Sequence, residues 1–215
     1  MLYHAGMSES TGTALHGSET RAEGVQRTRH QVVNAVRGLL IESGYHRLSL
    51  EQVAHDAGIT RVTIYRHFGS KLGLLEAVAD DLSVRGRAAE RITAALELPD
   101  TSASLRALVH ALCGFWSTDP PLFRRMVSLS AVDPEAREVL GARERWRYEG
   151  IATMAERLAA EGRLRPPFDT DQAAATIAAV TSFPACDQIA TALAVDMHAL
   201  PALLLPLLAG VARLE

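Results

Sequence analysis

Residues 46–71 constrain the fold of this chain more than any other part of the sequence, because turn signals bracket two short apolar segments. Ser49 precedes the first segment and Gly58 follows it, while Thr60 precedes the second and Gly69 follows that one. Hydroxyl side chains accept the free N–H groups at helix starts, and glycine readily takes the left-handed conformation that ends helices. The pattern therefore predicts two short helices joined by a tight turn, the arrangement of a helix-turn-helix motif.

Helical periodicity continues on both sides of this motif. Apolar side chains recur at helical spacing over residues 25–43, and a further helix is expected over residues 71–96. Within the motif, Ser49 and Gln52 have the spacing of a capping box, in which each side chain bonds the other residue's backbone N–H. The sequence therefore predicts an N-terminal three-helix domain over residues 25–72.

The charge of the chain is uneven. Its net charge is −3, but residues 25–71 hold seven basic and three acidic side chains, which leaves −7 for the remainder. A basic segment in an acidic protein suggests an anionic partner for that segment. Residues 1–24 are polar with no apolar run, so we expect a disordered tail rather than a signal peptide. Arg21, Arg27 and Arg29 fit either a basic arm in a minor groove or a solvated tail.

The second short helix carries the side chains that DNA recognition requires. Ile64 and Phe68 form its inner face, and basic, hydroxyl and aromatic groups occupy the other faces. Arginine can fork onto guanine and a methyl group can contact thymine, whereas hydroxyl, imidazole and ammonium groups bond phosphates. The residues that we assign to bases are Arg61, Val62, Thr63 and Arg66. Those that we assign to phosphates are Ser49, Thr60, Tyr65, His67 and Lys71. The alternative is an ordinary polar face.

The residues of this domain resemble the DNA-binding domain of the TetR family of transcriptional regulators. The matching positions are Ala35, Gly44, Tyr45, Leu50, Val53, Ala54, Ala57, Gly58, Ile59, Thr60, Thr63, Ile64, Tyr65, Phe68, Lys71, Leu74 and Leu75. The resemblance is specific over residues 27–76, and beyond them only the number and length of helices are similar. It implies a homodimer with an effector pocket in the C-terminal domain, and DNA contacts from the matching positions.

The remaining residues, 73–215, show helical spacing and no convincing strand, so we expect an all-α chain of about nine helices. The longest helix should cover residues 134–161. The side chains expected on its inner face are Val139, Ala142, Trp146, Met154 and Leu158, and those expected mostly outside are Arg143, Arg145 and Arg147. An Ala-rich helix from Asp169 or Thr170 to about Leu193 should be kinked at Pro184, because proline removes a backbone hydrogen bond.

The last two helices have the features of a subunit interface. The final helix carries an apolar stripe of Leu200, Leu203, Leu204, Leu207, Leu208 and Val211, which a monomer would rarely leave exposed. The Ala-rich helix carries small residues that allow close helix approach, namely Ala173, Ala174, Ala178 and Ala179. Periodicity alone also fits a core within one chain. The predicted helix-turn-helix motif favours the dimer, because a two-fold dimer places two recognition helices on two DNA half-sites that lie about 34 Å apart or multiples of that.

The middle helices hold most of the aromatic and sulfur side chains, which suggests a cavity for a small, mostly apolar effector. The candidate effector-binding residues are His110, Cys113, Phe115, Trp116, Phe123, Met126, Trp146, Met154 and Phe183. Tyr148 and Cys186 belong to the same set. Ordinary core packing is the alternative for each of them taken singly.

Other classes of function have little support in the sequence. His110 and Cys113 are three residues apart and could form a thiolate–imidazole pair, but no orienting carboxylate or oxyanion loop accompanies them. No metal-ligand spacing and no phosphate-binding glycine loop is present, so we expect no metal and no cofactor. The two cysteines form no disulfide framework, which fits a reducing, cytoplasmic setting. The apolar stretch 199–211 is too short to span a membrane.

The sequence as a whole predicts a DNA-binding transcriptional regulator that reads a palindromic operator in double-stranded DNA as a homodimer. Repression relieved by a small-molecule ligand is the expected mode, with the helix over residues 71–96 as the lever between the domains. The alternatives are a helical small-molecule-binding or catalytic protein with a vestigial reader, and a regulator that requires its ligand as a co-repressor.

Overall fold

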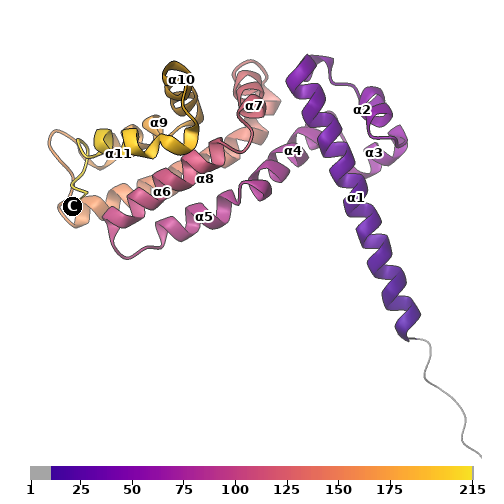
Figure 1. Ribbon diagram of the computed structural model, residues 1–215, viewed down its shortest axis with the longest axis horizontal. Coiled ribbons are helices and arrows are strands. Elements are labelled where there is room, and N and C mark those ends of the chain that lie inside the picture. Colours follow the sequence, from indigo (N-terminus) through magenta and orange to yellow (C-terminus); the bar gives the residue numbers. More distant parts are fainter. Residues whose placement is uncertain (1–10, 215) are drawn as a thin grey trace, which may run out of the picture.

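The computed structural model describes the backbone of residues 11–214 and the side chains of residues 23–214. The described chain is all-α, as expected, with an isolated bridge between Leu164 and Ala212 as its one extended pairing (Figure 1). Its elements are α1 (Thr11–Ser43), η1 (Tyr45–Arg47, a 3-10 turn), α2 (Leu50–Asp56), α3 (Arg61–Phe68), α4 (Lys71–Arg85), α5 (Ala88–Leu96), α6 (Thr101–Trp116), α7 (Pro120–Val132), α8 (Pro134–Ala160), α9 (Thr170–Val180), α10 (Phe183–Leu193), η2 (Met197–Ala199, a 3-10 turn) and α11 (Pro201–Leu208). The eleven α-helices exceed the nine expected because two expected helices are broken.

The helices form two lobes (Figure 1). The helices α1, α2 and α3 gather at one end, and α4 runs from them into an elongated body made by α5 to α11. The N-terminal lobe is held by side chains that are at most 2% exposed: Val36, Leu40, Val53, Ile64 and Leu74. Burial of each such side chain contributes roughly 1.5–3 kcal/mol, so this small core fixes α3 against α1, α2 and α4.

The helix starts predicted at Ser49 and Thr60 are confirmed, and Ser70 caps α4 in the same way. The hydroxyls of Ser49, Thr60 and Ser70 each accept the backbone N–H three residues on, at 3.1, 3.2 and 3.1 Å. The reciprocal half of the capping box is wrong. The Gln52 amide donates instead to Asp56 Oδ1 at 2.7 Å, one helical turn ahead, where exposed side chains four residues apart are neighbours.

The expected helix over residues 71–96 is broken, which corrects the sequence prediction. The segment α4 ends at Gly86, Arg87 takes a left-handed conformation with φ of 50°, and α5 follows. A Cβ atom at residue 86 would lie 2.5 Å from Cδ2 of Phe115, so the ring needs glycine there. The break lets α5 turn onto α6, a contact that the local sequence pattern does not show.

The inner face of α8 also differs from the expected one. Trp146 is 42% exposed, whereas Arg147, expected outside, is only 8% exposed. Nη1 of Arg147 donates to Ala178 O at 3.2 Å and to Thr181 Oγ1 at 3.4 Å, while Nε and Nη2 donate to Glu144. An arginine can be buried where polar partners are complete, so the stripe is shifted by one residue in this part of α8.

The expected kink at Pro184 is a full break between α9 and α10. The helix α9 ends at Val180, and Ser182 caps α10, which carries Pro184 in its first turn. Proline suits a first turn because the N–H it lacks would have no helical partner there. Asp169 caps α9 in a capping box with Gln172, which confirms the predicted start of that helix.

The backbone is helical from Thr11, well upstream of residue 25, where the apolar periodicity begins. Once a stable helical turn exists, each further residue adds one backbone hydrogen bond. The helix α1 can therefore extend beyond the part that packs against the core. The expected disordered tail is therefore helical over residues 11–24, while residues 1–10 lie outside the described part. Among the described residues, no single helix is long and apolar enough to cross a membrane. The bent pair of α10 with η2 and α11 meets that test jointly, by length and composition.

Candidate DNA interface and effector cavity

The helix α3 presents its outer faces to solvent, at the end of the N-terminal lobe (Figure 1). Ile64 is 1% exposed and anchors the inner face, while Val62 and Tyr65 are 78% and 60% exposed. Large apolar side chains left so open on a short helix have no structural role within the chain. The exposed or half-exposed residues predicted to contact DNA are Thr60, Arg61, Val62, Thr63, Tyr65, Arg66 and His67, and all lie on α3 or its cap.

Three of these residues, Thr60, Arg61 and Thr63, already have partners within the chain. Arg61 forms an ion pair with Glu51 of α2, both side chains being about three-fifths exposed. The hydroxyls of Thr60 and Thr63 are 2.9 Å apart, which orients Thr63 at the start of α3. An exposed ion pair contributes little to stability, so its effect is on the position of the Arg61 guanidinium.

Lys71 and Ser49 flank α3 at the positions predicted to hold phosphates. The Lys71 ammonium lies 4.2 Å from the centroid of the Tyr45 ring, a cation–π contact. Partial burial lowers the pKa of Lys71, and burial raises the pKa of Tyr45. Ser49 is half-buried, and its hydroxyl caps α2. The Tyr45 ring is therefore a partner for the Lys71 ammonium, which is a cation in the first turn of α4.

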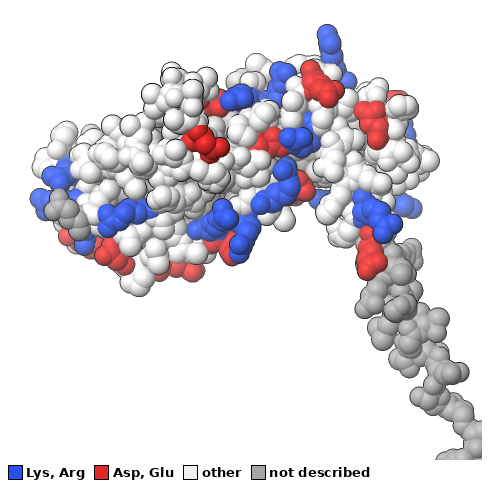
Figure 2. All heavy atoms as spheres, in the orientation of Figure 1, with Lys and Arg blue, Asp and Glu red and all other residues white. Residues whose placement is uncertain are grey.

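Close packing of α3 on α4 depends on Gly73. A Cβ atom there would lie 1.9 Å from the carbonyl oxygen of Phe68, so no larger residue fits without moving one helix. The candidate arm residues diverge: Arg29 stacks over the Phe68 ring at 5.6 Å, Arg27 is exposed, and the side chain of Arg21 lies outside the described residues. On the face shown in Figure 2, basic and acidic side chains alternate rather than forming one basic surface.

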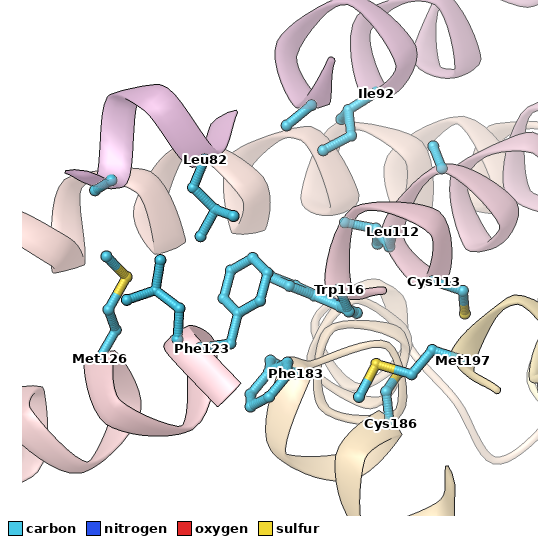
Figure 3. Close-up of a cluster of buried hydrophobic side chains, with 14 of the residues drawn as sticks. Leu82, Ile92, Leu112, Cys113, Trp116, Phe123, Met126, Phe183, Cys186 and Met197 are labelled. Carbon is cyan, nitrogen blue, oxygen red and sulfur yellow. The ribbon is translucent and has the colours of Figure 1, made fainter. Parts of the chain in front are cut away.

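A cavity of about 400 Å³ opens between α4, α6, α7, α8 and α10. Its apolar lining includes Leu82, Phe115, Phe123, Met126 and Phe183. Figure 3 shows Leu82 of α4, Phe123 and Met126 of α7, and Phe183 of α10 gathered around one region. The residues of its polar rim are Ser83, Ser130, Arg137, Arg143, Glu144 and Ser182. This size and this mixture are typical of a site for a mostly apolar small molecule.

A second cavity of about 440 Å³ lies on the other side of Phe115, between α4, α5, α6 and α8. It shares Ser83, Phe115, Arg143 and Glu144 with the first, and adds Trp116 and Trp146. The rings of Phe115, Trp116, Phe123 and Phe183 form one cluster, with neighbouring centroids 4.9–5.8 Å apart. The indole N–H of Trp116 donates to Thr181 O at 2.9 Å, which fixes the cluster.

The candidate effector residues therefore divide into two groups. Six line one cavity or both: Phe115, Trp116, Phe123, Met126, Trp146 and Phe183. The other three, His110, Cys113 and Met154, line neither. His110 is exposed on the outer face of α6, while Cys113 and Met154 are core residues at 0% and 1% exposure. The sequence pattern missed the rim residues, because arginines on a long helix normally indicate a solvated face.

The two cysteines are free, fully buried neighbours on α6 and α10. A hydrogen bond with Cys186 and burial raise the pKa of Cys113, so its thiol stays protonated near neutral pH. His110 points outward, so the pair with Cys113 considered from sequence is not formed. Among the described residues, no group of three His, Cys, Asp or Glu side chains is arranged to hold a metal ion.

Polar contacts join α7, which forms one cavity wall, to the N-terminal lobe. Asp119, whose side chain is 1% exposed, forms an ion pair with Arg37 of α1, with one N–O distance of 3.0 Å. It also lies 3.6 Å from the guanidinium of Arg85 at the end of α4. Arg125 donates two hydrogen bonds to Ile41 O, near the end of α1, at 2.7 and 3.0 Å.

The structure thus combines an outward-facing helix-turn-helix lobe with a helical body that holds an apolar cavity. Residues 32–78 match the model described as "Bacterial regulatory proteins, tetR family". Residues 32–78 therefore belong to the TetR family of bacterial regulators, a family of transcription regulators and not of enzymes. The resemblance seen in the sequence is therefore confirmed.

Relatives support this assignment. The transcriptional activator FasR of Mycolicibacterium smegmatis is 31% identical over 131 residues, which is 55% of this chain and 58% of that protein. The regulator AlkX of Mycobacterium tuberculosis is 38% identical over 69 residues, 32% of either chain. This chain thus spans less than two thirds of the length of these curated relatives.

Solved structures match the fold over most of the chain. Bacillus subtilis FadR, described in complex with stearoyl-CoA, has a TM-score of 0.68 at 19% identity, covering 85% of this chain and 98% of that one. NalD, the secondary repressor of a Pseudomonas aeruginosa multidrug efflux pump, has a TM-score of 0.68 at 24% identity, covering 89% and 98%. At these identities the likeness establishes the fold alone.

Proposed function

We propose that this chain is a sequence-specific repressor that a small-molecule ligand releases from its operator. The observation that carries the proposal is the outer face of α3, where Val62 and Tyr65 are open to solvent beside Arg61 and Arg66. No apolar partner covers Val62 and Tyr65 among the described residues, and the face has the donors and methyl groups that base edges require. The base and phosphate contacts assigned from the sequence are part of this proposal. Because the proposed partner is DNA, the proposed location of the protein is the cytoplasm.

The proposed assembly is a homodimer formed through α10 and α11. Four apolar side chains on these helices or in the loop after α10 remain 41–56% exposed: Leu193, Val195, Leu203 and Leu207. The other stripe leucines, Leu200, Leu204 and Leu208, are buried within the chain, so the final helix contributes to both the core and the open surface. A two-fold dimer would pair two α3 helices on a palindromic site.

The small residues of the Ala-rich helix have a different part from the one expected. Ala173, Ala174 and Ala178 are buried within the single chain, because α9 packs closely on α8. Of the four alanines, Ala179 is exposed. The proposed dimer therefore rests on the exposed leucines rather than on an alanine surface.

The ligand is proposed to bind in the 400 Å³ cavity. It is proposed to favour a dimer in which the spacing of the two α3 helices does not match the two DNA half-sites. Its wall includes Leu82 of α4, and α4 begins at Lys71 beside the recognition helix. Its wall also includes Phe123 and Met126 of α7, which contacts α1. A ligand that prefers one arrangement of these helices lowers operator affinity by its differential affinity for the two states.

The direction of regulation is the part to test first. Relatives include an activator, FasR, and a repressor, NalD, so a co-repressor or activator mode is the second candidate. Purified protein should shift DNA from its own upstream region in a salt-sensitive, sequence-selective way, and ligand should dissociate the complex. An absence of any selective shift contradicts the regulator. Ligand that strengthens the preformed complex contradicts release and supports the second candidate.

A further inference from the structure

The rim of the 400 Å³ cavity carries charged side chains, and most of them are neutralised by one another. Arg143 of α8 is paired with Asp80 of α4. Glu144 accepts two hydrogen bonds from the buried Arg147, at 3.0 and 3.2 Å. These two pairs leave no net charge for a ligand to balance, and Glu144 has its countercharge already.

Arg137 is different, because no carboxylate lies within ion-pair distance of it in the described part of the chain. Its Nε and one Nη donate to the carbonyls of Ser130 and Ala131, at 2.8 and 2.9 Å. These carbonyls are in the last turn of α7, where a helix carries only a partial negative charge. The second Nη has no hydrogen-bond partner among the described residues. Arg137 also sits in the first turn of α8, where the helix dipole disfavours a cation.

The rim therefore has one positive charge in excess, directly above an apolar chamber. We infer that the effector is an amphipathic anion, with an apolar body against Phe115, Phe123 and Phe183 and one carboxylate or phosphate group at Arg137. A bare cation at the mouth of an apolar site favours an anionic head group, since guanidinium bonds both kinds of anion through paired N–H groups. A neutral ligand would leave this charge unmatched, and a cationic ligand would meet it directly.

This assignment rests on the proposed effector role of the cavity and adds the chemical class of the ligand. The test compares four probes with one twelve-carbon chain: dodecanoate, dodecyl phosphate, dodecanol and dodecyltrimethylammonium. Isothermal titration calorimetry on the full chain, with each probe below its aggregation concentration, measures the dissociation constants. Both anions, or one of them, should bind at least about tenfold more tightly than the alcohol, and the cation should bind most weakly. The tighter of the two anions identifies the head group.

Two variants and a matched control locate the effect. Arg137→Gln removes the charge, Arg137→Lys keeps it, and Arg145→Gln removes one charge from α8 outside both cavities. Arg137→Gln should weaken anion binding about tenfold and leave dodecanol binding unchanged, while the other two variants keep the native preference. Thermal melts show whether each variant is folded.

The inference is overturned if the native chain binds the alcohol or the cation as tightly as the anions. It is also overturned if Arg137→Gln and Arg145→Gln bind the anions equally well. A selective DNA shift without any anion preference refutes the ligand class and leaves the regulator standing. Anion preference without any DNA shift refutes the regulator and retains the binding site.

Discussion

Replacement of Arg37 by methionine should destabilise the chain by about 2 kcal/mol, because it leaves the Asp119 carboxylate buried with incomplete partners. Asp119 is 1% exposed at its side chain, and its best partner is the Arg37 guanidinium, which contacts both carboxylate oxygens. After the change, the carboxylate keeps the Arg85 guanidinium at 3.6 Å and the backbone N–H of Leu122 at 3.4 Å. Methionine retains most of the volume of the arginine stem, so packing is largely preserved.

The magnitude follows from the burial of the two partners. Removal of one member of a fully buried pair costs about 3–5 kcal/mol. The Arg37 side chain is 40% exposed, so water screens part of the attraction, and Arg85 keeps part of the compensation. Asp119→Asn should cost less, about 1 kcal/mol, since it leaves a half-exposed cation and keeps an oxygen to cap α7. The double variant should cost less than the sum of the two.

Equilibrium urea denaturation at pH 7, followed by circular dichroism, measures these free energies of unfolding. The matched control is Arg145→Met, whose partner Glu138 is 79% exposed and whose loss should cost less than about 0.5 kcal/mol. If Arg37→Met costs no more than this control, and the Arg37–Asp119 cycle is additive, the buried contact does not hold α1 to α7. The coupling between the cavity wall and the DNA-binding lobe would then have to run through α4 or through the contact of Arg125 with Ile41.

Four further predictions concern the reader and the interface. Arg61→Ala should lose about 1–3 kcal/mol of operator discrimination with the fold intact, so equal loss on all DNA sequences in fluorescence anisotropy contradicts a base contact. Gly73→Ala should lower the melting temperature by several degrees, because its Cβ would lie 1.9 Å from Phe68 O, and a native melting curve refutes this. Leu207→Glu should convert the proposed dimer to a monomer in sedimentation, and an unchanged mass places the interface elsewhere. Burial lowers the pKa of Lys71, so its ammonium loses its charge at a lower pH than an ordinary lysine does. Operator affinity should therefore fall as pH rises through that pKa, whereas the affinity of Lys71→Arg should stay unchanged. Parallel curves of affinity against pH for the two proteins contradict the phosphate contact.

The helix-turn-helix motif was predictable from the sequence, because the contacts that begin its helices and orient their side chains join residues only a few positions apart. A hydroxyl residue three positions before a backbone N–H forms the same cap in any surroundings, as Ser49, Thr60 and Ser70 do. Ile64 and Phe68 face inward because they lie four residues apart on one helix. The side chains left over on α3 are then the exposed ones, and their chemistry is legible in the sequence.

The breaks in the expected helices could not be predicted in the same way. Residues 71–96 have unbroken helical spacing, but α4 ends at Arg85 and Arg87 takes the left-handed conformation. Gly86 between them carries no side chain, and the Phe115 ring, from a helix that follows later, occupies the space of one. The exchanged positions of Trp146 and Arg147 have a similar origin, since the partners of Arg147 lie on α9 and beyond it. Periodicity records which residues are apolar, but it does not record which polar groups find partners.

The lining of the effector cavity was likewise predictable only in part. Its apolar wall was largely identified from the aromatic residues of the middle helices, whereas His110, Cys113 and Met154 were included because spacing alone does not separate cavity from core or surface. The rim was missed altogether, because Arg137 and Arg143 look like solvated charges until α4 and α7 are placed beside them.

The sequence by itself determined the helical class, the caps of the reader and the residues that α3 presents, because these depend on contacts within a few positions. Only the tertiary structure decided where the long helices break, which arginine is buried and which charge above the cavity lacks a counterion. Those features depend on distances between residues far apart in the chain, and such distances exist only once the helices have packed.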